Sequence, residues 1–64
     1  MIKVFEYEGM TVTFDFGDHN VLVTEEYKAG KYGYNGEPST KIMTEAEAER
    51  EIGKLIRLGY IGMN

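Results

Sequence analysis

The sequence has no cysteine and no tryptophan, and it has one proline, one histidine and one serine among its 64 residues. Without cysteine, the chain cannot form a disulfide bond or a thiolate metal site. His19 alone cannot provide a multi-histidine metal site. A nucleophilic triad needs a serine or cysteine beside a base, and we expect Ser39 and His19 to lie on loops that are far apart. The sequence therefore predicts a protein without enzymatic activity, metal or cofactor.

Long apolar runs are also missing. The N-terminal stretch MIKVFEYEGM is interrupted early by acidic residues, so it does not have the pattern of a signal peptide. No stretch approaches the roughly 20 apolar residues that a membrane-spanning helix needs. We therefore expect a soluble, cytoplasmic chain that does not interact with membranes, and the lack of cysteine is compatible with a reducing compartment.

Basic residues are the minority among the charged side chains. Seven lysines and arginines stand against 11 aspartates and glutamates, which gives a formal net charge of −4. Because affinity for nucleic acids comes largely from basic side chains that neutralise phosphates, this balance argues against direct nucleic-acid binding. It is compatible with a protein partner that has a basic surface.

The length of the chain predicts one small domain over residues 1–64. A chain of this size buries only about 60% of the surface that its unfolded form exposes, so its stability margin is small. Many small domains gain stability from a partner subunit. A homodimer is therefore one of the alternatives.

Two alternating segments at the start of the chain predict a β-hairpin. Residues 2–7 (IKVFEY) and 10–16 (MTVTFDF) flank Glu8-Gly9, a two-residue turn. This turn sets a register with the pairs Tyr7–Met10, Phe5–Val12 and Lys3–Phe14. Since side chains alternate between the two faces of a strand, one face collects Phe5, Tyr7, Met10, Val12, Phe14 and Phe16. The other face carries Ile2, Val4, Glu6, Thr11, Thr13 and Asp15.

A third strand is predicted over residues 21–27 (VLVTEEY), after a loop of turn-forming residues, 17–20. If Phe16 pairs with Val21, then Val23 and Tyr27 join the aromatic face. Glu25 also falls on that face, and it requires either a position near the rim or a bulge that turns it outward.

The segment EEYKAGKYGYNGEPSTK, residues 25–41, is interpreted as a further hairpin followed by a loop. A turn at Ala29-Gly30 would pair Tyr27 with Tyr32 and Glu25 with Tyr34. Asn35-Gly36 is a turn signal, and Pro38 disfavours a long further strand. Residues 35–43 are therefore expected to form a loop.

The last element is a predicted helix that begins after Thr44 and ends at Gly59. Thr44 and Glu47 have the spacing of a capping box, and Gly59 is suited to a left-handed stop. Gly53 inside this helix suggests a close approach to the sheet or to a partner. The residues expected on the buried side are Ala48, Ile52, Leu55, Ile56 and Gly59, with Leu58 at the margin and Tyr60 or Ile61 folding back against the last turn.

Together these elements predict an α+β fold. It consists of an antiparallel three- to four-stranded β-meander with one C-terminal α-helix packed on one face. The helix and the aromatic face of the sheet would then bury each other's apolar surfaces.

Three motifs with superficial likeness to functional sites are interpreted as ordinary turns or sheet edges. The spacing of Gly30, Gly33 and Gly36 does not open a helix, as a dinucleotide-binding loop must. Residues 31–34 (KYGY) resemble only faintly the aromatic stretch of RNA-recognition and cold-shock domains. The polar loop with Asp18 and His19 lacks the ligand spacing of an EF-hand.

Ile2, Val4 and Leu22 lie on the face that the helix leaves uncovered, and acidic residues surround them. An apolar patch of this kind often marks an interface. The leading hypothesis is a non-enzymatic protein-binding module, similar in size and charge to phage- or mobile-element-encoded inhibitors and modulators of host nucleic-acid-processing or defence proteins. The residues expected to contact the partner are Glu6, Glu8, Asp15, Asp18, Ile2, Val4, Leu22, Tyr27, Tyr32 and Tyr34.

Two alternatives are kept. In the first, Tyr27, Tyr32 and Tyr34, with Lys28 and Lys31, form a sheet edge that stacks on single-stranded nucleic acid. In the second, the chain is a structural or self-associating small domain.

Overall fold

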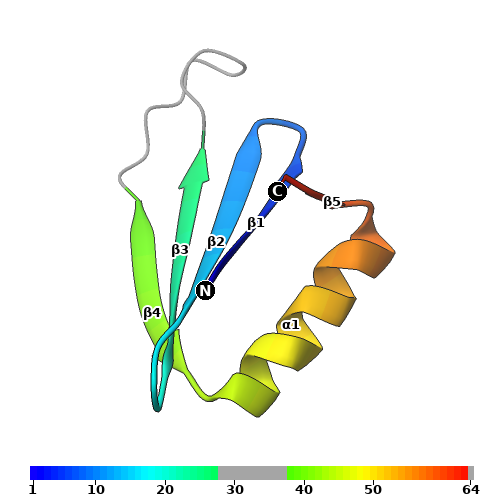
Figure 1. Ribbon diagram of the computed structural model, residues 1–64. Helices are drawn as coiled ribbons and strands as arrows, with labels where there is room; N and C mark the ends of the chain where they lie inside the picture. Colours follow the sequence, from blue (N-terminus) through cyan, green and yellow to red (C-terminus); the bar gives the residue numbers. More distant parts are fainter. Residues whose placement is uncertain (28–37, 64) are drawn as a thin grey trace.

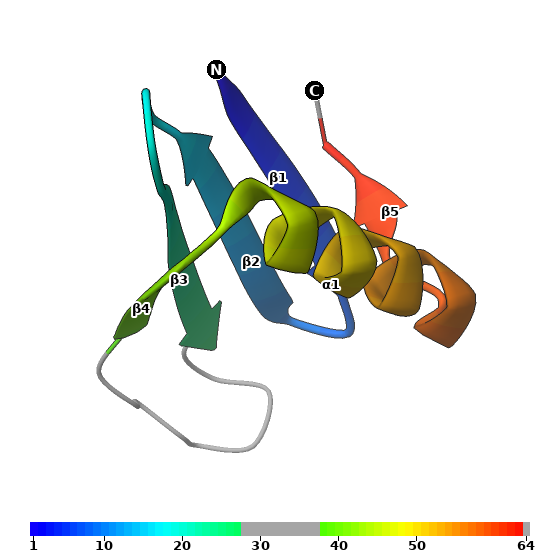
Figure 2. The ribbon, with the colours of Figure 1, turned by 90° about the horizontal axis from the view of Figure 1, so that it is seen from below.

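A computed structural model describes residues 1–27 and 38–63 of the chain. These residues form a five-stranded antiparallel sheet, with strand order β4-β3-β2-β1-β5, and one helix on one of its faces (Figures 1 and 2). The predicted α+β class, a β-meander with one C-terminal helix, is confirmed. The elements are β1 (Ile2–Tyr7), β2 (Met10–Phe16), β3 (Val21–Tyr27), β4 (Ser39–Met43), α1 (Glu45–Leu58) and β5 (Ile61–Gly62).

The first hairpin has the predicted register. Phe5 lies opposite Val12, and Tyr7 lies opposite Met10. Both turn residues have positive φ angles, 45° at Glu8 and 82° at Gly9. Positive φ at both positions is typical of the type I′ turn, whose twist matches that of the strands it joins.

The second hairpin also has the predicted register, with Phe16 opposite Val21. Its loop is closed by a hydrogen bond in which the Gly17 N–H donates to the Asn20 carbonyl at 2.9 Å. The pairing is continuous to the end of β3, so no bulge turns Glu25 outward. Glu25 instead lies opposite Val12 and forms an ion pair with Lys41, with 3.6 Å between Oε1 and Nζ.

Residues 39–43 form strand β4, so the predicted loop over 35–43 is wrong in this part. Ser39 lies opposite Glu25, which also rules out the predicted Glu25–Tyr34 pair. Pro38 directly precedes the strand, where its missing N–H removes no hydrogen bond from the ladder. The predicted turns at Ala29-Gly30 and Asn35-Gly36, and the Tyr27–Tyr32 pair, lie outside the described residues.

Strand β5 adds an element that the sequence analysis did not predict. Ile61 lies opposite Glu6, and Gly62 lies opposite Phe5. The Met63 N–H continues this contact by donating to the Val4 carbonyl at 2.8 Å. Ile61 therefore extends the sheet and does not fold back against the last helical turn.

Helix α1 begins and ends where the sequence predicts. The Glu47 N–H donates to Thr44 Oγ1 at 3.1 Å, and the Thr44 N–H donates to Glu47 Oε1 at 2.9 Å, which is a complete capping box. Gly59 ends the helix with φ 107°. The N–H groups of Gly59 and Tyr60 donate to the Ile56 and Leu55 carbonyls, as in a Schellman motif.

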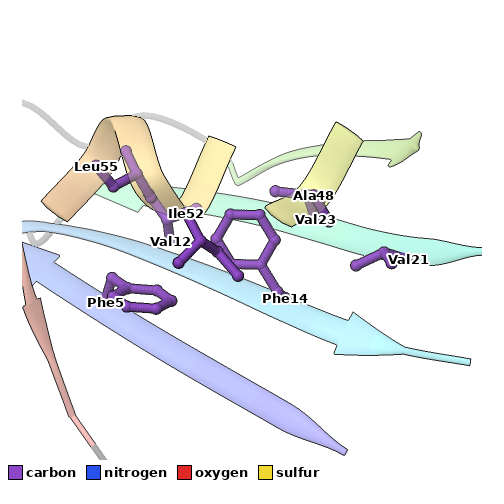
Figure 3. Packing of buried hydrophobic residues seen from close by; sticks show 8 residues of the cluster. All are labelled: Phe5, Val12, Phe14, Val21, Val23, Ala48, Ile52 and Leu55. Atoms are coloured by element: carbon purple, nitrogen blue, oxygen red, sulfur yellow. The ribbon is translucent and has the colours of Figure 1, made fainter. Parts of the chain in front are cut away.

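The core lies between α1 and the aromatic face of the sheet (Figure 3). Phe14 is at its centre with 1% exposure, and its ring meets that of Phe5 edge-on, with 5.8 Å between the centroids. The prediction that Phe5, Val12 and Phe14 face Ile52 and Leu55 is confirmed. The prediction for Ile56 is wrong, because this side chain is exposed. The buried set is Phe5, Val12, Phe14, Val21, Val23, Ala48, Ile52 and Leu55.

Gly53 does not mark a close approach within the described chain. A Cβ atom placed on Gly53 would have no heavy atom within 4 Å. The predicted close contact with the sheet is therefore wrong. The position is open and lies beside a groove that is described below.

Candidate protein-interaction surface

The face of the sheet opposite to α1, here called the outer face, is uncovered by any described element (Figure 2). Side chains directly opposite each other on neighbouring strands share a face. The pairing therefore places Ile2, Asp15, Leu22 and Ile42 in one row across β1, β2, β3 and β4. Ile2, Leu22 and Ile42 have 53%, 41% and 67% of their surface exposed. We call these three residues the apolar row.

A second and a third row run parallel to the apolar row. Consecutive residues on the same face of a strand are about 6.8 Å apart, since the rise is about 3.4 Å per residue. The second row consists of Val4, Thr13, Thr24 and Thr40. The third row consists of Glu6, Thr11 and Glu26, with Ile61 beside Glu6 on β5.

The described basic side chains are confined to one side of the sheet. The outer face carries three carboxylates, those of Glu6, Asp15 and Glu26, and its described strand residues include no lysine or arginine. The described basic side chains lie on the aromatic face or on α1. They are Lys3, Lys41, Arg50, Lys54 and Arg57.

The structure brings together about half of the residues predicted to contact a partner. Ile2, Val4, Glu6, Asp15 and Leu22 all lie on the outer face, as expected from alternation along the strands. Val4 and Glu6 are half-buried, and the other three are exposed.

Glu8 and Asp18 are not part of this face. Glu8 lies in the turn between β1 and β2, and Asp18 lies in the loop between β2 and β3. These two connections are at opposite ends of the long axis of β2. The two carboxylates are exposed, but they cannot form one rim with each other.

Tyr27 lies on the aromatic side, opposite Met10 at the end of β3. It is near Tyr60, whose ring packs on that of Tyr7 with 5.4 Å between the centroids. The Tyr60 hydroxyl donates to Met10 Sδ at 3.2 Å. Burial raises the pKa of the Tyr60 hydroxyl above its usual value, and the neighbouring Tyr27 and Glu25 raise it further. Tyr27 therefore belongs to a different surface from Ile2 and Leu22, while Tyr32 and Tyr34 lie outside the described residues.

Several residues of the outer face were missed by sequence reasoning. Ile42 and Thr40 were assigned to a loop, although the alternating segment STKIM is compatible with a strand. Ile61 lies in a two-residue strand, which gives no periodic signal. Glu26 was not among the residues predicted to contact a partner, although alternation along β3 places it on the outer face.

The polar residues that were considered for chemistry are dispersed. Ser39 is the first residue of β4, so the prediction that it lies on a loop is wrong. It lies opposite Glu25, near the C-terminal end of β3. His19 lies in the loop between β2 and β3, next to the N-terminal end of β3. Within residues 1–27 and 38–63, no group of three or more histidine, cysteine, aspartate or glutamate side chains is close enough to hold a metal ion.

Comparison of the chain with protein-family models, with curated proteins and with solved structures finds no match. In the described part of the chain, no helix has both the length and the apolar character that crossing a membrane requires.

Proposed function

We propose that this protein is a non-enzymatic protein-binding module whose outer face contacts a basic surface of its partner. The observation that carries the proposal is the composition of the outer face. The outer face combines carboxylates with an exposed apolar row, and its described strand residues include no lysine or arginine. Complementary charge of this kind gives specificity and a fast encounter with a basic partner.

The apolar row would supply the desolvated centre of the contact. Burying exposed apolar surface contributes about 25 cal/mol per Å², and hot spots of protein interfaces are usually apolar or aromatic groups surrounded by polar ones. Leu22 lies near the start of β3, an inner strand of the sheet, opposite Asp15 on one side and Ile42 on the other. A partner that covers Leu22 would therefore contact apolar and acidic groups together.

Self-association through the outer face is disfavoured by the same charges. Two copies that met face to face would bring six carboxylates together, three from each copy, and like charges that face each other are destabilising. A partner of opposite charge has no such penalty. Proteins with exposed basic surfaces include those that bind nucleic acids, so an inhibitor or modulator of such a protein is the narrower form of the proposal.

The test is affinity capture from lysate, followed by mass spectrometry, with two matched variants. The outer-face variant carries Ile2→Lys and Leu22→Lys. The control variant carries Ile56→Lys and Leu58→Lys on α1, where 56% and 61% of these side chains are exposed. Both variants change the net charge by the same amount at exposed apolar positions.

We expect one or more proteins to be retained by the wild type and the control variant, and to be lost from the outer-face variant. A protein that all three forms retain equally would contradict the assignment of the outer face. Circular dichroism of both variants would verify that each is folded.

A further inference from the structure

An open groove of about 650 Å³ lies between β4 and α1. Its origin is geometric. A helix with its side chains is about 10 Å wide, and strands are about 4.8 Å apart, so one helix covers only two or three strands. The buried residues of the sheet come from β1, β2 and β3. The helix-facing side of β4 is therefore left beside an open space, which we call the β4–α1 groove.

Four of the five described basic side chains line the β4–α1 groove. They are Lys41, Arg50, Lys54 and Arg57. This concentration is unusual in a chain with a net charge of −4. The groove is thus the basic region of an otherwise acidic molecule.

Two carboxylates also line the groove, and both are engaged locally. Glu51 forms an ion pair with Lys54, with 3.5 Å between Oε1 and Nζ. Glu47 accepts a hydrogen bond from the Thr44 N–H in the capping box. Lys41 is paired with Glu25. Among the described residues, Arg50 and Arg57 have no carboxylate at ion-pair distance.

The groove is bordered by an edge of the described sheet. β4 is the outermost strand on its side of the described sheet. In an edge strand, every second residue directs its N–H and C=O groups away from the neighbouring strand, and these groups can pair with an added chain. Such strand addition is a common mode of peptide recognition.

From the edge and the groove together, we propose that β4 binds an extended acidic segment of a partner protein as an added strand. Side chains of an extended segment alternate between faces. Carboxylates at every second position would therefore point into the groove, toward Arg50 and Arg57. The basic side chains of the groove lie on the helix side of β4 and on α1, although Ile42 of the apolar row also lines it. The proposal therefore goes beyond the proposed function and does not depend on it.

A second copy of this chain is a poor occupant of the same edge. Antiparallel pairing of two β4 strands over their full length would centre on Lys41. It would place Lys41 of one copy opposite Lys41 of the other, and like charges directly opposite each other are destabilising. Single-stranded nucleic acid is a poorer occupant, because it has no peptide N–H and C=O groups to pair with the backbone at the edge of β4.

The probe is a fluorescently labelled eight-residue peptide that alternates glutamate and valine and is capped at both ends. A peptide that alternates lysine and valine and a ten-nucleotide single-stranded oligo-dT are two of the controls. Two further controls are N-methylated forms of the acidic peptide, one methylated at its odd-numbered residues and the other at its even-numbered residues. Binding is measured by fluorescence anisotropy at low ionic strength. The chemical shifts of the β4 amides, residues 39–43, locate the site.

The protein variants are Arg50→Gln with Arg57→Gln, and Lys3→Glu as the control. Each changes the net charge by two units, but Lys3 lies on β1 over the Phe16 ring, away from the groove. We expect the double arginine variant to weaken binding of the acidic peptide roughly tenfold, the combined effect of two ion pairs. Lys3→Glu is expected to leave the affinity within about twofold of the wild type, since screened charges at this distance contribute little.

We expect the acidic peptide to bind and to change the chemical shifts of the β4 amides. We also expect one of the two N-methylated peptides to lose binding. A dissociation constant above about 1 mM for the acidic peptide would overturn the proposal. Equal binding of both N-methylated peptides would also overturn it, because the added strand requires backbone hydrogen bonds. Tighter binding of oligo-dT than of the acidic peptide would assign the groove to nucleic acid instead.

Discussion

Asp15 and Leu22 lie directly opposite each other on β2 and β3, and both side chains are exposed on the outer face. Ile2 lies opposite Asp15 on the other side. A charged residue between two apolar neighbours in the middle of a sheet contributes little to strand stability, since aspartate is among the residues depleted in strands. Its position is explained if Asp15 contacts a partner.

This reasoning gives a prediction for Asp15→Val. We expect the free energy of unfolding to rise by roughly 0.5 kcal/mol, because valine is favoured in strands and aspartate is not. We also expect retention of the captured partner to fall. Thr13→Val, in the next row of the same strand, is the control that adds a β-branched apolar residue without removing a charge. Urea unfolding and capture are the two measurements, and unchanged capture by Asp15→Val would contradict the role given to this carboxylate.

The core prediction concerns Phe14. Truncation to alanine removes the most deeply buried ring and leaves a cavity beside Phe5, which typically costs about 3–5 kcal/mol. In a domain of this size such a loss removes most of the stability. Leu58→Ala, at an exposed position of α1, should change the free energy of unfolding by less than about 0.5 kcal/mol. Thermal unfolding of both variants tests this, and similar stabilities of the two would refute the described core.

The capping box gives a prediction for Thr44. Thr44→Ala removes the acceptor for the Glu47 N–H, and we expect it to cost about 1 kcal/mol in the free energy of unfolding. Urea unfolding at neutral pH measures the change. Thr40→Ala on the outer face, where the substituted residue caps no helix, is the control for the loss of a threonine. Equal effects of the two substitutions would argue against a special role for the cap.

Glu47 should make the free energy of unfolding depend on pH. Hydrogen bonds from the Thr44 backbone and side chain hold the pKa of the Glu47 carboxyl below its usual value of 4.5. Because the pKa is lowered in the folded state, the stabilisation is present above the unfolded-state pKa and is lost as the pH falls through the folded-state value. The stability difference between the wild type and Glu47→Gln should therefore decrease in acid. Glu49→Gln, two residues further along the helix and also exposed, is the comparison. A stability difference between the wild type and Glu47→Gln that stays constant with pH would contradict the prediction.

The two helix glycines should respond in opposite directions to alanine. Gly53 has an ordinary helical environment with open space around its Cβ position, so Gly53→Ala should stabilise the protein by about 0.5–1 kcal/mol. Gly59 has φ 107°, and an added Cβ would lie 3.1 Å from Tyr7 Cε1, so Gly59→Ala should destabilise it. Thermal unfolding distinguishes the two. A stabilising Gly59→Ala would contradict the left-handed stop and the close contact with Tyr7.

The parts of the fold that local rules govern could be predicted from the sequence. The turn at Glu8-Gly9 sets the register of the first hairpin, and the capping box at Thr44 and the stop at Gly59 set the ends of α1. Each signal involves residues that are close in sequence. These signals fix local conformation almost independently of the rest of the chain.

The edges of the sheet could not be predicted in the same way. β4 and β5 exist because β3 and β1 offer free edges, and that pairing depends on sheet order and not on a local motif. Ile56 was misplaced for a related reason: its apolar side chain fits the helical periodicity, but a single helix on a sheet buries a narrower stripe. For the outer face, alternation located Ile2, Val4 and Leu22, whereas Ile42 and Ile61 depended on the two unpredicted strands.

The most direct test of the outer-face assignment is a methyl NMR titration of the protein with the partner obtained by capture. The account predicts that the methyl resonances of Ile2, Leu22 and Ile42 shift or broaden on binding, while those of Ile56 and Leu58 on α1 stay unchanged. Shifts confined to Ile56 and Leu58, with Ile2, Leu22 and Ile42 unaffected, would contradict it.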